Sequence, residues 1–322
     1  MACPRLLGNS AGISNGKYLF AIVRDVPRHC SYTKRCVQCK KNRMNIKKQF
    51  HYDPEVEVSA SQIGISKWDW ISTKSTEEKV AVEVMMNNRF DVLPIENTDG
   101  TFNSYFSTQE WNVYSSLNKN KINDAQTIYY RLSLKDLVRK FKNDDRHYYF
   151  LTDYDQILGL VSYVNLNCQL VYNYLFFIIA DIERSVSGIL KEYVSQDKIL
   201  AVFEQSDDKH LLELHETFQE NITENNDNDI FQHMYLQTIG FTLKKFLNEL
   251  PNEYKALNKY SSKFGTKGVY NLVRQKVMHP VRPILSDKKS INQIDELLTD
   301  YIEIKNIAES TTHNNGNRCT TP

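Results

Sequence analysis

Arg274 and His279 are the two residues whose types and spacing best suit chemistry on a phosphodiester. They lie at the end of a predicted helix, because apolar residues recur at helical spacing up to Val277 and Pro280 disfavours helix at the residue before it. His279 is thereby placed at a helix C-terminus, where the helix dipole favours the protonated imidazole. A permanent guanidinium cation beside an imidazole that exchanges protons near neutral pH is a plausible phosphodiester-handling pair. The alternative is an exposed arginine and a histidine that only caps the helix.

A second candidate set of side chains lies near the N-terminus: His29, Cys30, Cys36 and Cys39. A structural zinc site normally has two Cys or His pairs at defined spacing, whereas this stretch has a single Cys-x2-Cys pair. We therefore predict free thiols and no structural metal. The surrounding segment, residues 28–48, carries lysines and arginines and no acidic residue. It could track a phosphate backbone or form a solvated basic loop.

The composition is that of a globular protein, with 41% hydrophobic and 25% charged residues in 322, a length that suggests two domains. A net charge of +1 gives no overall preference for nucleic acid. Six cysteines in a chain of this length do not form a disulfide framework, which favours the reducing cytoplasm. We predict no membrane association, because the N-terminus has no secretory signal and the most apolar run, residues 170–180, is too short to span a bilayer.

Residues 59–168 contain an internal repeat of helix, strand, turn and strand. In the first unit a candidate cap, Ser75-x-x-Glu78, begins the helix, and strands 91–95 and 103–106 follow. In the second unit the cap is Ser133-x-x-Asp136, and the strands are 148–151 and 157–161. Both units close on a serine followed three residues later by a hydrogen-bond acceptor: Ser107 with Glu110, and Ser162 with Asn165.

This duplicated arrangement resembles a pair of CBS motifs, known as a Bateman module. The resemblance implies that an adenine nucleotide binds in a cleft between the two units. Ser107 and Ser162 would contact phosphate, and Glu110 and Asn165 would accept hydrogen bonds from ribose hydroxyls, although the family usually has Asp at that position. The alternative is a CBS pair that serves only as a dimerising scaffold.

Residues 169–309 have helical periodicity throughout and predict an all-α bundle. The expected helices are 170–195, 208–221, 230–248, 266–279 and a last one capped by Ser290-x-x-Gln293 that runs to about 308. The first half of helix 170–195 is apolar on nearly every side, which is typical of a buried central helix. Asp181 and Glu183 are its conspicuous polar interruptions, and Glu183 either faces the Arg274–His279 motif or is solvated.

The segment from Leu272 to Pro283 resembles the signature of HEPN domains, an Arg-x4-6-His motif that often runs on into Met-His-Pro. The resemblance implies a homodimer in which two motif helices meet and cleave single-stranded RNA without a metal, leaving 2′,3′-cyclic phosphate ends. Arg274 would stabilise the phosphorane and His279 would transfer protons or hold the phosphate, under regulation by nucleotide at the CBS pair. The alternative is a non-catalytic, nucleotide-sensing dimerisation protein whose bundle docks a partner.

The expected fold class is therefore α+β, in four parts. These are a basic N-terminal extension (1–58), a CBS pair (59–168), a HEPN bundle (169–309) and a disordered tail (310–322).

Overall fold

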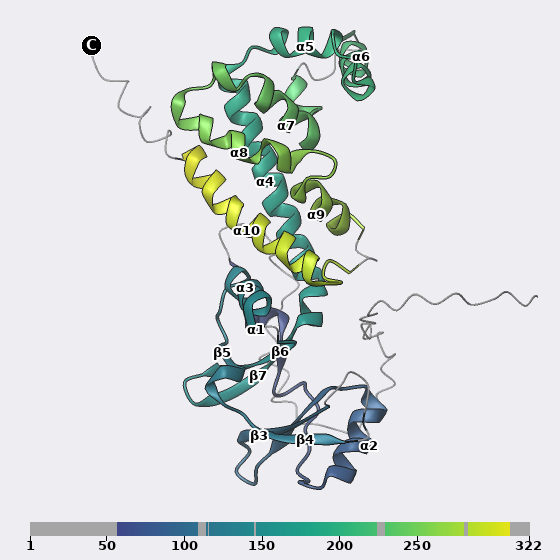
Figure 1. Cartoon of the computed structure of the whole chain (residues 1–322), viewed down its shortest axis with the longest axis vertical. Helices are drawn as coiled ribbons and strands as arrows, with labels where there is room; N and C mark the ends of the chain where they lie inside the picture. The colour runs from purple at the N-terminus through teal and green to yellow at the C-terminus, as the bar shows by residue number, and fades with distance from the viewer. Residues whose placement is uncertain are drawn as a thin grey trace, which may run out of the picture.

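The computed structural model describes residues 57–108, 114, 116–144, 146–223, 229–279 and 283–309. A region of two small sheets lies at one end of a helical bundle (Figure 1). The predicted α+β class is confirmed. None of the described helices is both long enough and apolar enough to cross a membrane. The basic segment 28–48 with its cysteines, and the tail 310–322, lie outside the described residues.

The first repeat unit folds as a parallel bridge, a helix and an antiparallel sheet. Thr73 forms the parallel bridge with Ile95, and the elements that follow are α2 (Glu78–Asn88), β2 (Val92–Glu96), β3 (Phe102–Thr108) and β4 (Leu117–Lys121). The predicted Ser75 cap is wrong, because α2 begins at Glu78 with Glu77 as its N-cap. The sequence gives no sign of β4, since its LNKNK stretch lacks apolar alternation.

The second repeat unit has the same plan. It comprises β5 (Thr127–Tyr129), α3 (Leu134–Asp144), β6 (Tyr148–Asp153) and β7 (Gln156–Ser162), with β5 parallel to β6 and β7 antiparallel to it. The Ser133 cap is confirmed, because its Oγ accepts a hydrogen bond from the Asp136 amide at 3.1 Å. A short preceding segment, α1 (Ala60–Ile63) and β1 (Ile65–Ser66), adds a strand to the free edge of β7, so that the sheet order is β1-β7-β6-β5.

Two details of register match between the hairpins. The pairing shifts between Ile95 and Glu96 in β2 and between Leu151 and Thr152 in β6, which is the same place in each unit. Ser107 and Ser162 also occupy equivalent positions, since each pairs with the first residue of the preceding strand, Val92 or Tyr148. The repeat predicted from the sequence is therefore present in the backbone.

The two units contact each other through aromatic rings. The ring centroid of Tyr105 lies 5.9 Å from that of Tyr148 and 5.1 Å from that of Phe150. The Trp70 ring packs edge-on against Phe102 at 4.8 Å and Phe150 at 6.4 Å. Edge-to-face pairs of this kind stabilise a contact beyond the area that they bury.

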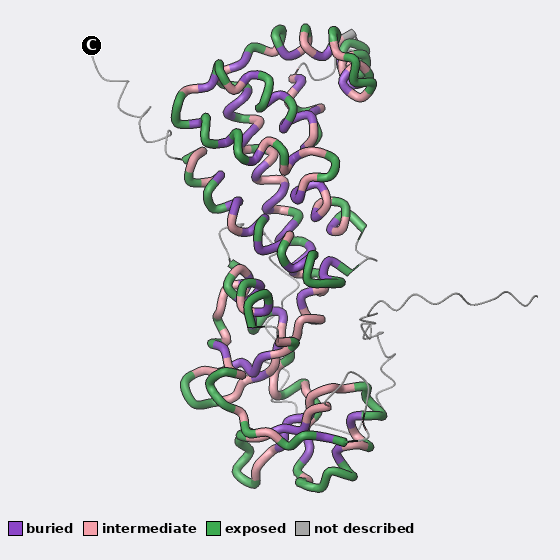
Figure 2. Tube along the Cα trace, in the orientation of Figure 1, coloured by how far each residue is buried: buried purple, intermediate pink, exposed green. Residues whose placement is uncertain are grey.

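The bundle is organised around α4 (Gln169–Tyr193), which runs along its length and buries ten of its 25 residues (Figures 1 and 2). It is reached from β7 through a 3-10 turn, η3 (Tyr163–Asn167). The other helices of the bundle are α5 (Gln196–Glu204), α6 (Lys209–Thr223), α7 (Leu236–Lys245), α8 (Asn258–Ser261), α9 (Val269–Val277) and α10 (Lys288–Glu309), of which α7, α9 and α10 pack on α4. Short 3-10 turns connect them: η4 (Ile230–Gln232), η5 (Leu247–Glu249), η6 (Asn252–Leu257) and η7 (Ser262–Phe264).

Two helix predictions differ from the structure. The predicted helix 230–248 is divided into η4, α7 and η5, so only its centre is α-helical. The last helix begins at Lys288 rather than after Ser290. Asp287 is its cap, because Asp287 Oδ1 accepts from the Ser290 amide at 2.7 Å while Ser290 Oγ accepts from the Asp287 amide at 3.1 Å.

The second repeat unit packs directly onto the bundle. Buried apolar side chains form one continuous cluster from Ile128 and Leu151 through α4 to Ile304. Ion pairs reinforce this junction, since Asp295 on α10 lies 2.6 Å from Lys142 Nζ and 3.7 Å from Arg139 Nε, both on α3. The first repeat unit has its own small core, made of Ala81, Met85, Leu93, Ile95, Phe106 and Leu117.

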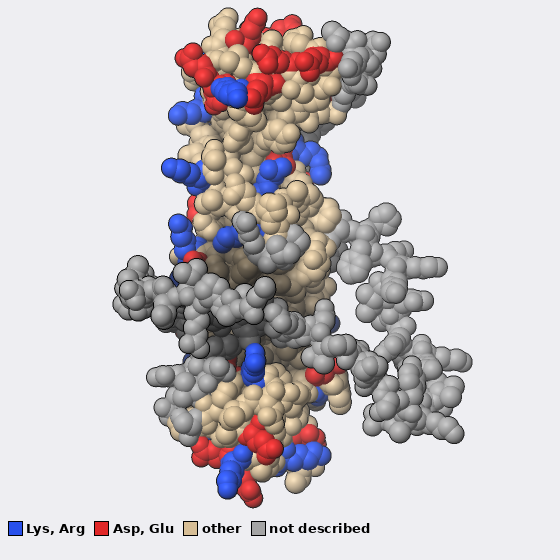
Figure 3. Space-filling view, turned by 90° about the vertical axis from the view of Figure 1, so that its right-hand side faces the viewer, with Lys and Arg blue, Asp and Glu red and all other residues tan. Residues whose placement is uncertain are grey.

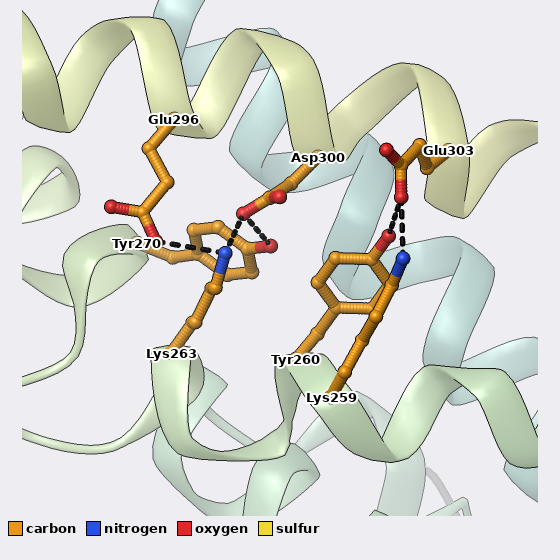
Figure 4. Close-up of polar contacts among 7 residues, drawn as sticks. All are labelled: Lys259, Tyr260, Lys263, Tyr270, Glu296, Asp300 and Glu303. Carbon is orange, nitrogen blue, oxygen red and sulfur yellow. Dashed lines mark hydrogen bonds and ion pairs between the residues drawn. The ribbon is translucent and has the colours of Figure 1, made fainter.

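Two carboxylates of α10 anchor the neighbouring segments in the same way. In each, one oxygen accepts hydrogen bonds from a lysine and a tyrosine (Figure 4). Asp300 Oδ2 accepts from Lys263 at 2.5 Å and from the Tyr270 hydroxyl at 2.9 Å. Glu303 Oε2 accepts from Lys259 at 2.5 Å and from the Tyr260 hydroxyl at 2.6 Å. Because Tyr270 belongs to α9, the first of these contacts sets the position of α9 on α10.

Candidate functional site

The Arg274–His279 motif lies at the C-terminal end of α9, as predicted. The helix ends at Val277 with Met278 as its C-cap, and the His279 amide donates to the Lys276 carbonyl at 3.2 Å. The core face of α9 is Val269, Tyr270, Val273 and Val277, all buried. Arg274 is half-buried and His279 is exposed. Pro280 lies outside the described residues, so its predicted role in ending the helix is untested.

Glu183 on α4 faces the motif, which answers the question that the sequence left open. Its Oε1 lies 3.8 Å from Arg274 Nε, and the carboxylate also accepts a hydrogen bond from the backbone N–H of Leu236 at the start of α7. Burial raises the pKa of Glu183, and the Arg274 charge and the Leu236 N–H oppose that rise. Side chains or backbone from three helices thus meet at one carboxylate, which forms an ion pair with Arg274 across the α4–α9 contact.

The loop after the motif is anchored from α9 itself. Lys276 Nζ donates to the Ile284 carbonyl at 3.1 Å, and burial lowers the pKa of this lysine. Ile284 and Leu285 are fully buried. The segment 283–287 is therefore anchored in the core by Ile284 and Leu285, although its other residues are exposed and it has no regular secondary structure.

The predicted nucleotide residues are divided between the two units, and each described one is hydrogen-bonded within its own unit. Asn165 Oδ1 accepts from both the amide and the hydroxyl of Ser162, at 2.7 Å each, which forms the capping box of η3. Ser107 Oγ accepts from Asn120 Nδ2 at 2.9 Å. Glu110 lies outside the described residues.

The η3 turn joins the second predicted nucleotide pair to the loop that follows the motif. Asn167 donates its Nδ2 to the Leu285 carbonyl at 3.2 Å and accepts from the Leu285 amide at 2.9 Å. The Tyr163 hydroxyl donates to the Asp287 carbonyl at 2.9 Å. A single turn therefore carries Asn165 and also holds the segment 283–287.

Sequence reasoning missed Tyr163, Asn167 and Lys276 as site residues. Tyr163 and Asn167 contact residues more than a hundred positions away in the chain, and an asparagine or tyrosine in a turn has no periodicity that would single it out. The sequence marks Lys276 only as a lysine on the apolar side of α9. His279, in contrast, was predicted to lie at a helix end because Pro280 follows it.

The charge is unevenly distributed over the bundle. Acidic side chains gather at the end formed by α5 and α6, whereas lysines and arginines are spread along the rest of the face seen in Figure 3. The acidic residues of this end are Asp197, Glu204, Asp207, Asp208, Glu213, Glu216 and Glu220, and the only basic side chains among residues 196–223 besides histidine are Lys198 and Lys209. A nucleic acid would be repelled from this end.

Within the described part of the chain, no three His, Cys, Asp or Glu side chains are grouped so that they could hold a metal ion. Cys168 is a free thiol. The His29, Cys30, Cys36 and Cys39 stretch lies outside that part, so the prediction that it holds no metal is untested.

Comparisons with known proteins leave the family open. No family model and no curated protein matches the chain. Among solved structures, it is similar to an uncharacterized conserved protein from Pyrococcus horikoshii, with 16% identity and a TM-score of 0.27, over 34% of this chain and 89% of that one. It is also similar to a hexameric CBS-CP12 protein from bloom-forming cyanobacteria, with 13% identity and a TM-score of 0.27, over 52% of this chain and 98% of that one. At such low TM-scores neither likeness establishes a family.

Proposed function

We propose that the chain is a nucleotide-regulated, metal-independent endoribonuclease of the HEPN type that acts as a homodimer on single-stranded RNA. The observation that carries the proposal is the arrangement at the end of α9. Arg274 forms an ion pair with Glu183 across the α4–α9 contact, at 3.8 Å, and His279 is exposed just beyond the helix end. A permanent cation and an accessible imidazole at the same helix end suit a reaction that develops charge on phosphate oxygens.

In the proposed reaction the ribose 2′-OH attacks the adjacent phosphorus in line with the 5′ oxygen that leaves. The new bond is O2′–P, the bond that breaks is P–O5′, and the products are a 2′,3′-cyclic phosphate and a 5′-OH end. One proton leaves the 2′-OH and another reaches the 5′ oxygen. His279 exchanges these protons, and Arg274 stabilises the charge on the phosphorane oxygens.

The proposed homodimer supplies the second acid–base group that the reaction uses. One chain supplies a single motif imidazole, whereas the reaction needs a base and an acid on opposite sides of the phosphorus. Two copies related by a two-fold axis would bring two motifs to one phosphate, with each histidine taking one role. Single-stranded RNA is the favoured substrate because in-line attack needs a flexible backbone.

The decisive experiment is incubation of the pure protein with labelled single-stranded RNA in EDTA, with and without adenine nucleotides. We expect cleavage that leaves cyclic phosphate ends and falls by about 10²–10⁴-fold in His279→Ala, the range for an essential acid-base group. Arg274→Lys keeps the charge but loses the planar guanidinium, so it should also cleave poorly. His147→Ala, at an exposed histidine outside the motif, is the matched control and should cleave like the parent.

The nuclease proposal fails if His279→Ala cleaves at the parent rate, or if the parent cleaves no RNA under any nucleotide condition. Circular dichroism and light scattering on every variant separate loss of chemistry from loss of fold or of the dimer.

For regulation, we propose that an adenine nucleotide binds between the repeat units through Ser107 with Glu110 or Ser162 with Asn165. Support comes from the equivalent places of Ser107 and Ser162 in the two hairpins and from the bonds between η3 and the loop 283–287. Calorimetry with AMP, ADP, ATP and S-adenosylmethionine tests it. Ser162→Ala should weaken binding, and Ser104→Ala on β3 is the control. Absence of binding at millimolar concentrations would leave the repeat as a scaffold.

A second candidate is a non-catalytic protein in which the repeat units sense a nucleotide and the bundle mediates dimerisation or docks a partner. The observation that favours it is the same ion pair. Glu183 already neutralises Arg274, as an ordinary contact between helices would. This candidate expects no RNA cleavage by the parent and retained nucleotide binding in His279→Ala.

A further inference from the structure

A hollow of about 230 Å³ lies beside β1, at a distance from both sites described above. It is lined by two aromatic rings, one lysine, two serines and two leucines: Trp68, Tyr130, Lys67, Ser61, Ser66, Leu151 and Leu158. No acidic side chain is among them. The predicted nucleotide residue Ser162 is on the same strand as Leu158 but four residues further, about 13 Å along β7.

The walls of the hollow are held by backbone contacts. The Ser61 amide donates to the Tyr130 carbonyl at 2.9 Å, and the Lys67 amide donates to the Leu158 carbonyl at 2.8 Å. Gly159 allows β1 to approach β7 this closely, because a Cβ at this position would come within 2.3 Å of the Ile65 carbonyl oxygen. The hollow is thus built into the β1–β7 pairing and needs no rearrangement to form.

The aromatic rings of the hollow are paired with cations, Trp68 with Lys67 in the lining and Tyr130 with the neighbouring Arg131. Trp68 is 83% exposed, an unusual state for so large an apolar ring. Lys67 Nζ lies 5.1 Å from the Trp68 ring centroid, and the Arg131 guanidinium lies 5.1 Å from that of Tyr130. Among the residues that the structure describes, neither cation forms an ion pair with a carboxylate. Two cations with unneutralised charge therefore stand beside two ring faces.

We propose that this hollow binds a nucleotide, a ligand that combines a flat aromatic base with an anionic phosphate. The base stacks on Trp68 at the mouth of the hollow, over the apolar floor of Leu151 and Leu158. The phosphate is bound by Lys67. The Ser66 hydroxyl, which accepts from the Trp68 amide at 3.3 Å, keeps its own hydrogen for a ligand oxygen. The ligand is either a free nucleotide or one nucleotide of a single strand, since both present the same groups.

Calorimetry on the full chain tests the site with AMP, UMP, the matching nucleosides and an eight-nucleotide oligodeoxyribonucleotide. The DNA strand has no 2′-OH and is not cleaved, so the result does not depend on the proposed nuclease. We expect Trp68→Ala and Lys67→Gln each to weaken binding by about tenfold or more, the range for losing one base–aromatic stack. Trp68→Phe keeps a ring face and should weaken binding less than Trp68→Ala.

Tyr154→Ala is the matched control, because Tyr154 is 94% exposed and is not among the residues that line the hollow. Ser162→Ala should weaken only the binding of adenine nucleotides at the proposed regulatory site, so the binding of UMP and of the oligodeoxyribonucleotide, which it should leave unchanged, reports on the hollow. Binding of mononucleotides identifies a free nucleotide as the ligand, and binding of the strand alone identifies single-stranded nucleic acid. The proposal is overturned if neither binds at millimolar concentration, or if Trp68→Ala and Lys67→Gln bind as the parent does.

Discussion

Glu183 on α4 lies 3.8 Å from Arg274 on α9, and the same carboxylate accepts a hydrogen bond from the first amide of α7. The pair joins helices that are far apart in the chain, and it involves the one residue of the motif that is half-buried. Among the described residues no ion pair restrains the His279 side chain, which is exposed beyond the helix end. The two motif residues therefore differ in what they contribute to the fold.

The first prediction uses the pKa of Glu183, which burial raises above the ordinary value of 4.5. An acid with a raised folded-state pKa contributes stability that is fully present below its unfolded pKa and is lost as pH rises through the folded pKa. The free energy of unfolding of the parent, relative to Glu183→Gln, should therefore fall as pH rises above about 4.5. Urea denaturation at a series of pH values measures this difference.

Glutamine is the appropriate replacement because its carbonyl can still accept from the Leu236 amide and from Arg274. Glu213→Gln, at an exposed glutamate on α6, controls for the loss of one negative charge. If the difference in the free energy of unfolding between the parent and Glu183→Gln is the same at every pH, the Glu183 carboxylate is not desolvated as the structure implies.

The second prediction compares two buried tyrosines whose hydroxyls donate hydrogen bonds to carboxylates of α10. Tyr270→Phe removes a hydrogen bond to Asp300, which is 8% exposed, so water cannot replace it. We expect a loss of about 1.5–3 kcal/mol of stability, the range for hydrogen bonds to charged groups. Tyr260→Phe removes the equivalent bond to Glu303, whose side chain is 48% exposed, and should cost less than about 1 kcal/mol. Urea denaturation of both variants measures the two losses of stability. Equal losses would contradict the prediction that the hydrogen bond to the less exposed carboxylate contributes more.

The third prediction compares two helical glycines. Gly188, in the interior of α4, would place a Cβ in open space, so Gly188→Ala should stabilise the protein by about 0.5–1 kcal/mol. Gly240, in α7, would place a Cβ 2.5 Å from Phe264 Cβ and 2.9 Å from the Ser261 carbonyl oxygen. Gly240→Ala should therefore destabilise it by about 1–3 kcal/mol. Thermal unfolding with opposite shifts of the midpoint supports the packing of α7 on η7, and shifts of the same sign contradict it.

The sequence was sufficient where local signals agree. Apolar periodicity located α4 and α9, and the duplicated hairpins located Ser107 and Ser162 at equivalent positions. Prediction from the sequence failed where contacts with a neighbouring strand or side chain override the local propensity of a segment. The polar strand β4 exists because β3 offers it a free edge, and α10 begins at Lys288 because the carboxylate of the preceding Asp287 reaches the Ser290 amide.

The site was predictable only in part, for the same physical reason. The sequence identified Arg274 and His279 and named Glu183 as a possible neighbour, but the orientation of Glu183 depends on how α4 and α9 cross. Asn167 could not be found, because its significance lies wholly in the backbone of Leu285, 118 positions later. Contacts of this range are set by the packed core and leave no local pattern.

The last prediction concerns that asparagine. Asn167→Ala removes both hydrogen bonds to Leu285, whose amide is then buried without this partner. We expect a stability loss of about 1–3 kcal/mol, the cost of leaving a buried donor unsatisfied. Hydrogen exchange at the Leu285 amide should accelerate more than global unfolding explains, since the segment 283–287 is held at that point.

Asn173→Ala is the matched control, because Asn173 is an exposed asparagine on α4 and its loss should leave exchange at Leu285 unchanged. If the nuclease and nucleotide proposals both hold, Asn167→Ala should still bind nucleotide and still cleave RNA, but cleavage should no longer respond to nucleotide. That result would follow because η3 carries Asn165 at the proposed nucleotide site and Asn167 at the loop behind the motif. Parent-like exchange at Leu285 in Asn167→Ala would show that the two bonds do not hold the loop, and the coupling would need another route.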